Sequence, residues 1–175
     1  MGAALSEIIL GLDPGTRHAG FGLIRVTGDR LEHLDHGVIR LNEKWNLSER
    51  LRRLHEELHK IYAQFSVKTT VVEKIFFGKN ADSAFKLGHA RGVCLLVSAQ
   101  HGVLVEEYAA RYAKKCVTGS GAASKDHVQL VVMNLLGLRS APLAFDASDA
   151  LALAVTHARV KDANSLMRKA LEDNL

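Results

Sequence analysis

The chain has 175 residues, of which 47% are hydrophobic, and a formal net charge of +4. This length suits one domain with one hydrophobic core. No window has the roughly 18 unbroken apolar residues of a membrane span, and residues 1–7 lack the basic start and apolar stretch of a signal peptide. We therefore expect a soluble, cytoplasmic protein without contact to a membrane, in which Cys94 and Cys116 are free thiols.

The first part of the chain predicts three strands. Residues 7–12 are too apolar to have a polar face, which indicates a strand at the centre of its sheet. Residues 19–27 and 31–41 flank Gly28-Asp29, a two-residue turn signal for a β-hairpin.

Strands and helices alternate from there on. Hydrophobic residues recur at intervals of three and four over 47–65, and Asn46 with Glu49 resembles a capping box, so this segment predicts a helix. Further strands are expected over 68–73 and 102–106, and further helices over 81–100, 107–115, 124–136 and 146–159. The fold class is therefore α/β, with a mixed central sheet, an antiparallel hairpin followed by parallel strands, flanked by helices. One domain is expected over 1–160, and 161–175 form a tail with apolar residues at helical spacing.

Four carboxylates lie where such a fold can bring them together. Asp13 and Glu73 end their strands, and active sites of parallel sheets form at that edge. Asp146 and Asp149 are three residues apart, which places both on one face of a helix at its first turn. Clustered carboxylates require cations, and their hard oxygens select Mg²⁺ or Mn²⁺; two such ions catalyse phosphodiester hydrolysis. From spacing alone, a set of helix caps and lysine partners is an open alternative.

The positive charge is concentrated in the middle of the chain. Residues 74–126 contain eight basic and four acidic residues, whereas 15 of each balance elsewhere. Such a segment suits a surface that binds a polyanion, although solvated lysines on helix faces explain the charge equally well.

Five segments together resemble one known family, the bacterial RuvC Holliday junction resolvases (crossover junction endodeoxyribonucleases): 9–17, 72–84, 86–92, 107–111 and 146–152. The likeness is collinear from about Ile8 to Val160. It implies an RNase H-like fold, a homodimer, and Mg²⁺-dependent symmetric nicking of four-way DNA junctions in homologous recombination and DNA repair. It also implies a contact with the branch-migration complex of RuvA and RuvB.

The resemblance assigns roles to individual positions. The family's catalytic, metal-binding acids correspond to Asp13, Glu73, Asp146 and Asp149, which are expected to hold two Mg²⁺ ions, with Mn²⁺ as a substitute. Phe76 matches an aromatic residue that contacts unstacked bases, unless it is a core residue. The expected DNA contacts are Phe76, Lys79, Arg111, Lys114 and Lys125, with Lys115 able to replace Lys114. Lys74 departs from the family, which has an uncharged polar residue there; it can face the site or point away.

The helix over 81–100 has small residues four apart, Ala84, Gly88 and Gly92. Glycines inside a helix cost about 1 kcal/mol each, so they indicate close packing. The resemblance implies a dimer around this helix; a close contact within one chain fits the stripe equally well.

Other functions fit parts of the sequence. Residues 55–59 match the H-E-x-x-H zinc pattern, but no third ligand with family spacing follows, and the same helix has to bury its leucines. Residues 12–16 also look like a phosphate loop of the actin and sugar-kinase superfamily, whose second lobe is missing here. Another RNase H-like nuclease, or a junction-binding protein without cleavage, is also compatible; the binding protein would be expected to lack one of the acids.

Overall fold

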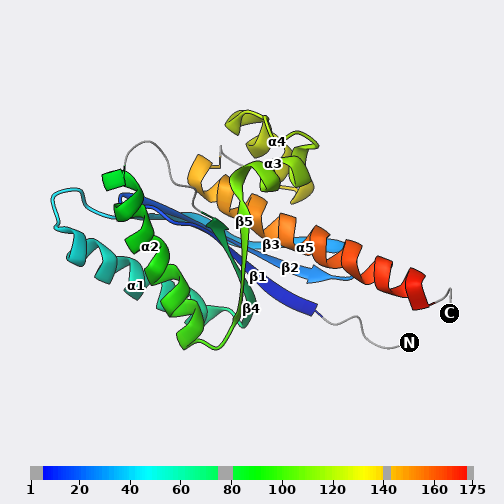
Figure 1. Cartoon of the computed structure of the whole chain (residues 1–175), viewed down its shortest axis with the longest axis horizontal. Helices are drawn as coiled ribbons and strands as arrows, with labels where there is room; N and C mark the ends of the chain where they lie inside the picture. The colour runs from blue at the N-terminus through cyan, green and yellow to red at the C-terminus, as the bar shows by residue number, and fades with distance from the viewer. Residues whose placement is uncertain (1–5, 75–80, 140–142, 173–175) are drawn as a thin grey trace.

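A mixed sheet forms the middle layer of the fold. The computed structural model describes residues 6–74, 81–139 and 143–172. The sheet has the order β3-β2-β1-β4-β5 (Figure 1). Its strands are β1 (Ser6–Asp13), β2 (His18–Thr27), β3 (Arg30–Arg40), β4 (Val67–Lys74) and β5 (Leu104–Ala109). β1, β2 and β3 pair antiparallel, while β1, β4 and β5 pair parallel. The predicted mixed sheet is confirmed.

Helices cover both faces of this sheet. They are α1 (Leu47–Gln64), α2 (Ala81–Gln100), α3 (Ala110–Thr118), α4 (Lys125–Leu135) and α5 (Phe145–Glu172). Figure 1 shows α1 and α2 on one face, and α5 with α3 and α4 on the other. Each face has its own cluster of buried apolar side chains. Across the described ranges, none of these helices has the length and apolar character needed to cross a membrane.

Alternation along β1 assigns its residues to the two faces. Ile9 packs in the cluster beneath α5, whereas Leu10 and Leu12 pack in the cluster beneath α1 and α2. Gly11 therefore faces α5, and a Cβ placed on it would lie 1.9 Å from the carbonyl oxygen of Ala150. Only glycine lets the helix backbone approach the strand this closely.

Local signals explain where several elements begin. The side chain of Asn46 accepts a hydrogen bond from the Glu49 amide (2.9 Å), and the Glu49 carboxylate accepts one from the Asn46 amide (3.0 Å), so the predicted capping box is confirmed. Gly28 has a positive φ of 57° in the hairpin turn between β2 and β3. Ser124 caps α4 by accepting from the His127 amide (3.2 Å).

The boundaries of β5 and α3 differ from the prediction. We expected the strand to end at residue 106 and the helix to cover 107–115, but β5 continues to Ala109. Tyr108 pairs with Glu73 and Ala109 with Lys74 in the ladder to β4. Pairing with the neighbouring strand outweighs the local helix propensity of these residues. The sequence alone does not show this pairing.

The last helix is longer than predicted. We expected it over 146–159, whereas α5 runs without a break from Phe145 to Glu172. Residues from Ala147 to Ala158 are mostly buried against the sheet, and residues 161–167 are exposed. The tail that we separated at residue 161 thus continues the same helix in the described part of the chain, past the end of the sheet.

Candidate active site

The two strand acids lie side by side at one edge of the sheet. Asp13 ends β1, and Glu73 lies one residue before the end of the parallel neighbour β4. Gly11 and Val71, two residues before them, face α5, so both acids lie on the α5 side. The prediction that these carboxylates converge at the carboxyl ends of parallel strands agrees with this geometry.

A cavity of about 280 Å³ lies between this edge and the helices. Three of the four predicted acids line it, Asp13, Glu73 and Asp149, together with Lys114 and Lys125. The fourth acid, Asp146, is in the first turn of α5 and does not line the cavity, but its charge helps to raise the pKa of Asp13. Within residues 6–74, 81–139 and 143–172, no three His, Cys, Asp or Glu side chains are arranged to hold a metal ion in this structure.

Burial makes the acids of the cavity hard to ionise together. Desolvation raises the pKa of Asp13 to about 8, with further contributions from the charge and hydrogen bond of Glu73. Desolvation also raises the pKa of Glu73. The two carboxyl groups interact, so ionisation of one makes ionisation of the other less favourable. A divalent cation bound beside these carboxyl groups would favour their charged forms.

Two lysines from different helices supply positive charge at the cavity. Nζ of Lys125 donates a hydrogen bond to Oδ2 of Asp149 (2.9 Å), and this bond raises the pKa of Lys125. Nζ of Lys114 donates to the carbonyl oxygen of Ala123 (3.0 Å), which connects α3 to the segment before α4. Lys115 is exposed and does not line the cavity, so the structure places Lys114 there and not its neighbour.

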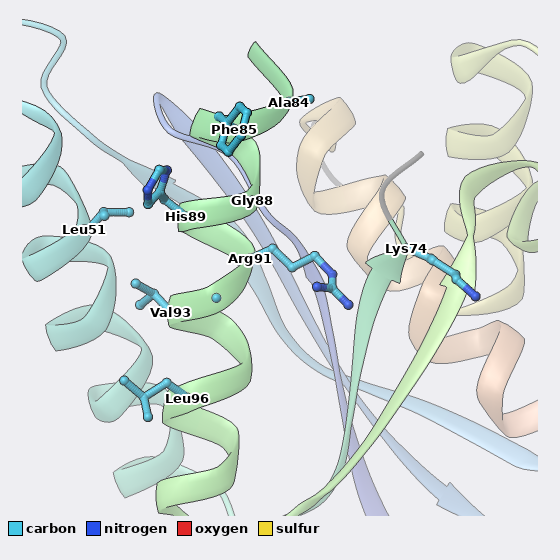
Figure 2. Close-up of a pocket in the computed structure, with 10 residues that line it drawn as sticks. Leu51, Lys74, Ala84, Phe85, Gly88, His89, Arg91, Val93 and Leu96 are labelled. Atoms are coloured by element: carbon cyan, nitrogen blue, oxygen red, sulfur yellow. The ribbon is translucent and has the colours of Figure 1, made fainter. Parts of the chain in front are cut away.

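The other predicted DNA contacts are not brought into the cavity. Arg111 is exposed on α3, where its side chain lies against Gly121. Phe76 and Lys79 lie outside the described residues. Lys74 follows Glu73 on β4 and therefore has the opposite orientation: it lines a groove beside α2 (Figure 2). The departure from the family at Lys74 thus lies on the other side of the sheet from the acids.

This α2 groove, a cavity of about 750 Å³, follows the stripe of small residues. Its lining includes Phe85 and Leu96, whose exposed fractions are 71% and 54%. A Cβ placed on Gly88 or Gly92 would meet no atom within 4 Å among the described residues. Gly88 and Gly92 therefore make no close contact inside the described chain, which contradicts the interpretation that they pack within one chain. Figure 2 shows Phe85, His89, Val93 and Leu96 projecting from α2 at the groove.

The H-E-x-x-H segment forms part of a histidine chain between helices. Nε2 of His59 lies 3.2 Å from Nε2 of His55, and its Nδ1 lies 2.8 Å from Nε2 of His101, just after α2. Glu56, which a zinc protease would use as a base, forms an ion pair with Arg52 (2.5 Å). The histidines therefore connect α1 with the end of α2.

Comparison with known proteins identifies the family. The family model described as crossover junction endodeoxyribonuclease RuvC matches residues 9–157. A protein of that name from Bdellovibrio bacteriovorus is 44% identical over 167 residues, covering 95% of this chain and 99% of the relative. One from Actinobacillus pleuropneumoniae is 48% identical over 151 residues, covering 86% and 78%.

The chain belongs to the RuvC family. Thermus thermophilus RuvC in complex with a Holliday junction substrate is similar, with a TM-score of 0.84 and 32% identity, over 90% of this chain and 96% of that one. The yeast mitochondrial Holliday junction resolvase Ydc2 shares the fold, with a TM-score of 0.68 at 10% identity. The RNase H-like fold that the RuvC resemblance implies is confirmed.

Sequence reasoning missed the small residues that bring α5 to the RuvC-type site. A Cβ on Gly20 would lie 2.0 Å from the carbonyl oxygen of Asp146, and one on Gly22 would lie 2.5 Å from the Leu151 side chain. With Gly11, these glycines let the first turns of α5 lie against β1 and β2. The signal in the sequence was a pair of glycines two positions apart, Gly20 and Gly22, in an otherwise mostly apolar strand.

Proposed function

We propose that this protein is a Mg²⁺-dependent endonuclease that resolves four-way DNA junctions by paired symmetric nicks in recombination and repair. The observation that carries the proposal is the convergence of Asp13, Glu73 and Asp149 on one cavity with two lysines, in a chain of the RuvC family. Asp146, next to this cavity, completes the proposed catalytic set. The proposed substrate, chromosomal DNA, puts the site of action in the bacterial cytoplasm.

The donor chemistry of the cavity fits a hard divalent ion. All four acids offer carboxylate oxygens, the ligands that Mg²⁺ prefers, and Mn²⁺ would bind them as well. The raised pKa values of Asp13 and Glu73 fit too, because an adjacent cation favours their charged forms. A pair of bound Mg²⁺ ions would activate a water molecule and stabilise the leaving oxygen of the scissile bond.

The chain's own residues have distinct tasks in this reaction. In their charged forms, Asp13 and Glu73 offer acceptor oxygens at the strand edge. Lys125 and Lys114 project into the cavity from two other helices, where their ammonium groups can contact a phosphate oxygen and offset its negative charge. Because helix α5 is packed against β1 through Gly11, the backbone that carries Asp149 is fixed beside the strand that ends at Asp13.

We also propose that the protein acts as a homodimer through the α2 groove. Phe85 and Leu96 expose apolar surface there, and Gly88 with Gly92 leaves room for a second backbone to approach. A two-fold dimer suits a four-way junction, which needs a nick in each of two like strands. Contact with RuvA and RuvB is a proposal from family membership alone. The division into a nuclease domain (1–160) and a tail (161–175) stays a proposal from the sequence.

A nicking assay tests the function. A labelled mobile four-way junction and a linear duplex of the same sequence are incubated with the protein in Mg²⁺, Ca²⁺ or EDTA. We expect symmetric nicks in the junction only, and only with Mg²⁺. Tight junction binding with intact strands in Mg²⁺ would instead favour a binding protein, and cutting of both substrates would favour a less selective RNase H-like nuclease.

A further inference from the structure

Two basic residues lie side by side on the strands β2 and β3, on the other side of Asp13 from Lys114 and Lys125. His18 begins β2, Arg40 ends β3, and the two are direct partners in the antiparallel ladder. Both are exposed. Within the described ranges neither side chain makes a hydrogen bond or an ion pair, although their neighbour Arg17 pairs with Glu43 (3.3 Å). The side chains of His18 and Arg40 are therefore available to donate hydrogen bonds to a ligand.

Both side chains lie on the face of the sheet that carries the acids. Direct partners in a ladder project to the same side, and residues two apart along a strand share a side. Gly20, two residues after His18, lies against the backbone of Asp146 at the start of α5. Val38, two residues before Arg40, packs against the cluster beneath α5. His18 and Arg40 thus lie near the N-terminal end of α5.

The strand register places this pair near the catalytic edge. Asp13 pairs with Gly20, so His18 lies one strand over and two residues farther along. With strands about 4.8 Å apart and a rise of about 3.4 Å per residue, the Cα atoms of His18 and Arg40 lie roughly 8 and 12 Å from that of Asp13. β2 and β3 are on one side of β1, whereas β5, which leads into α3 and Lys114, is on the other. Basic side chains therefore flank the acids on both sides.

The backbone before His18 is held in place by other elements. The carbonyl oxygen of Thr16 accepts a hydrogen bond from Nη1 of Arg50 on α1 (3.0 Å), and that of Arg17 accepts one from the amide of Leu41 (2.8 Å). A binding group on a fixed backbone loses less conformational entropy when a ligand arrives. The backbone beside the pair is thus fixed, while the two side chains are exposed.

We propose that His18 and Arg40 form a binding site for a DNA backbone phosphate that flanks the scissile one. The guanidinium group of Arg40 is always cationic and matches phosphate oxygens with two parallel N–H donors, and the imidazole of His18 adds one more. A strand that crosses the edge of the sheet is then held on one side by this site and on the other by Lys114 and Lys125. This inference rests on the proposed nuclease function, whose DNA path it specifies.

The salt dependence of binding tests the site without cleavage. Binding of a fluorescent four-way junction and of a linear duplex is measured in EDTA between 50 and 200 mM salt for the wild type, Arg40→Gln, Arg40→Lys and His18→Asn. Arg30→Gln is the matched control, because Arg30 is an exposed arginine at the far end of the same strand, roughly 33 Å away. Thermal melting of each variant checks that it is folded.

One lost phosphate contact lowers the slope of log K against log salt by about 0.9. We therefore expect the affinity ratio of wild type to Arg40→Gln to shrink about 3-fold between 50 and 200 mM salt. His18→Asn should weaken binding to a smaller extent, while Arg40→Lys and Arg30→Gln should keep the wild-type slope. A wild-type slope for Arg40→Gln, or an equal loss in Arg30→Gln, would overturn the proposal. If the protein binds duplex and junction equally and Arg40→Gln still lowers the slope, the result supports the phosphate site and contradicts the proposed specificity for junctions.

Discussion

Nζ of Lys125 lies 2.9 Å from Oδ2 of Asp149, so a lysine at the start of α4 contacts an acid that we propose as a metal ligand on α5. Lys125 is about half exposed in this pair, whereas Asp149 is mostly covered. The lysine can therefore turn to an incoming phosphate while the carboxylate stays where it is. Lys125 thus neutralises Asp149 in the free protein, and in the proposed complex it would neutralise the phosphate of the DNA.

Substitution of Lys125 should affect cleavage more than folding. We expect Lys125→Ala to lower the single-turnover rate of junction cleavage about 100-fold, as loss of one stabilising donor at a reacting centre does. Because the side chain of Lys125 is about half exposed, the ion pair contributes little to stability, and the melting temperature should change by only about 1–2 °C. Lys115→Ala, which removes an exposed neighbour outside the cavity, is the control and should stay within about 3-fold of the wild type. Equal rates for the two variants would contradict the placement of Lys125 at the reacting phosphate.

Neutralising a catalytic acid should separate binding from cleavage. We expect Asp13→Asn and Asp149→Asn to cut no junction in Mg²⁺ while binding it as tightly as the wild type or more tightly, because less negative charge opposes the phosphate. Asp162→Asn, on the exposed part of the same helix α5, is the control and should cleave normally. Gel shifts in EDTA and nicking in Mg²⁺ measure the two properties. Wild-type cleavage by either variant would show that the proposed metal cluster is wrong.

The stability of the metal-free protein should depend on pH through Asp13. Its pKa is raised from the ordinary value of 3.8 to about 8 in the folded state. The folded protein therefore binds the proton more tightly than the unfolded one, and the stability that this group contributes is fully present below pH 3.8 and lost as pH rises through 8. We expect the melting temperature in EDTA to fall between pH 6 and 9, and to fall less in Asp13→Asn.

Addition of Mg²⁺ provides the second measurement for this prediction. Because the ion binds the charged form of the carboxylate, its stabilising effect should grow from pH 6 to pH 9 in the wild type and be lost in Asp13→Asn. An equal decline of melting temperature in both proteins would assign the pH dependence to other groups.

The α2 groove should control the oligomeric state. We expect Leu96→Glu to shift the protein from dimer to monomer in sedimentation experiments, because it places a charge in the apolar surface. Leu104→Glu is the matched control: Leu104 is similarly exposed, at 59%, but does not line the groove. In a plasmid junction, the monomeric variant should produce single nicks where the wild type produces pairs. A dimer that persists in Leu96→Glu would place the interface elsewhere.

A side chain at Gly11 should separate α5 from the sheet. The added Cβ of Gly11→Ala would overlap the backbone oxygen of Ala150, so we expect a loss of about 1–3 kcal/mol in the free energy of unfolding, together with loss of cleavage. Since the overlap involves backbone, Ala150→Gly should not restore stability in the double variant. Urea denaturation measures the difference, and an unchanged midpoint would contradict the close packing.

Local interactions explain which parts of the fold could be predicted. The capping box of Asn46 and Glu49 and the hairpin turn at Gly28 depend on residues a few positions apart, and both are confirmed. The boundary between β5 and α3 was wrong, because Tyr108 is held in the strand by pairing with Glu73 in another part of the chain. Such pairing depends on residues far apart in sequence.

The chemistry of this protein can be read from its residue types alone: carboxylates at strand ends, a basic middle segment, and motifs that identify the RuvC family. Which of these groups lie close together depends on the fold. It placed Lys114 rather than Lys115 in the cavity, turned Lys74 away from the acids, and brought Arg40 to the same edge as Asp13. The physical reason is that residue type determines what a side chain can do, whereas strand register and the close packing of α5 on glycines determine where it lies.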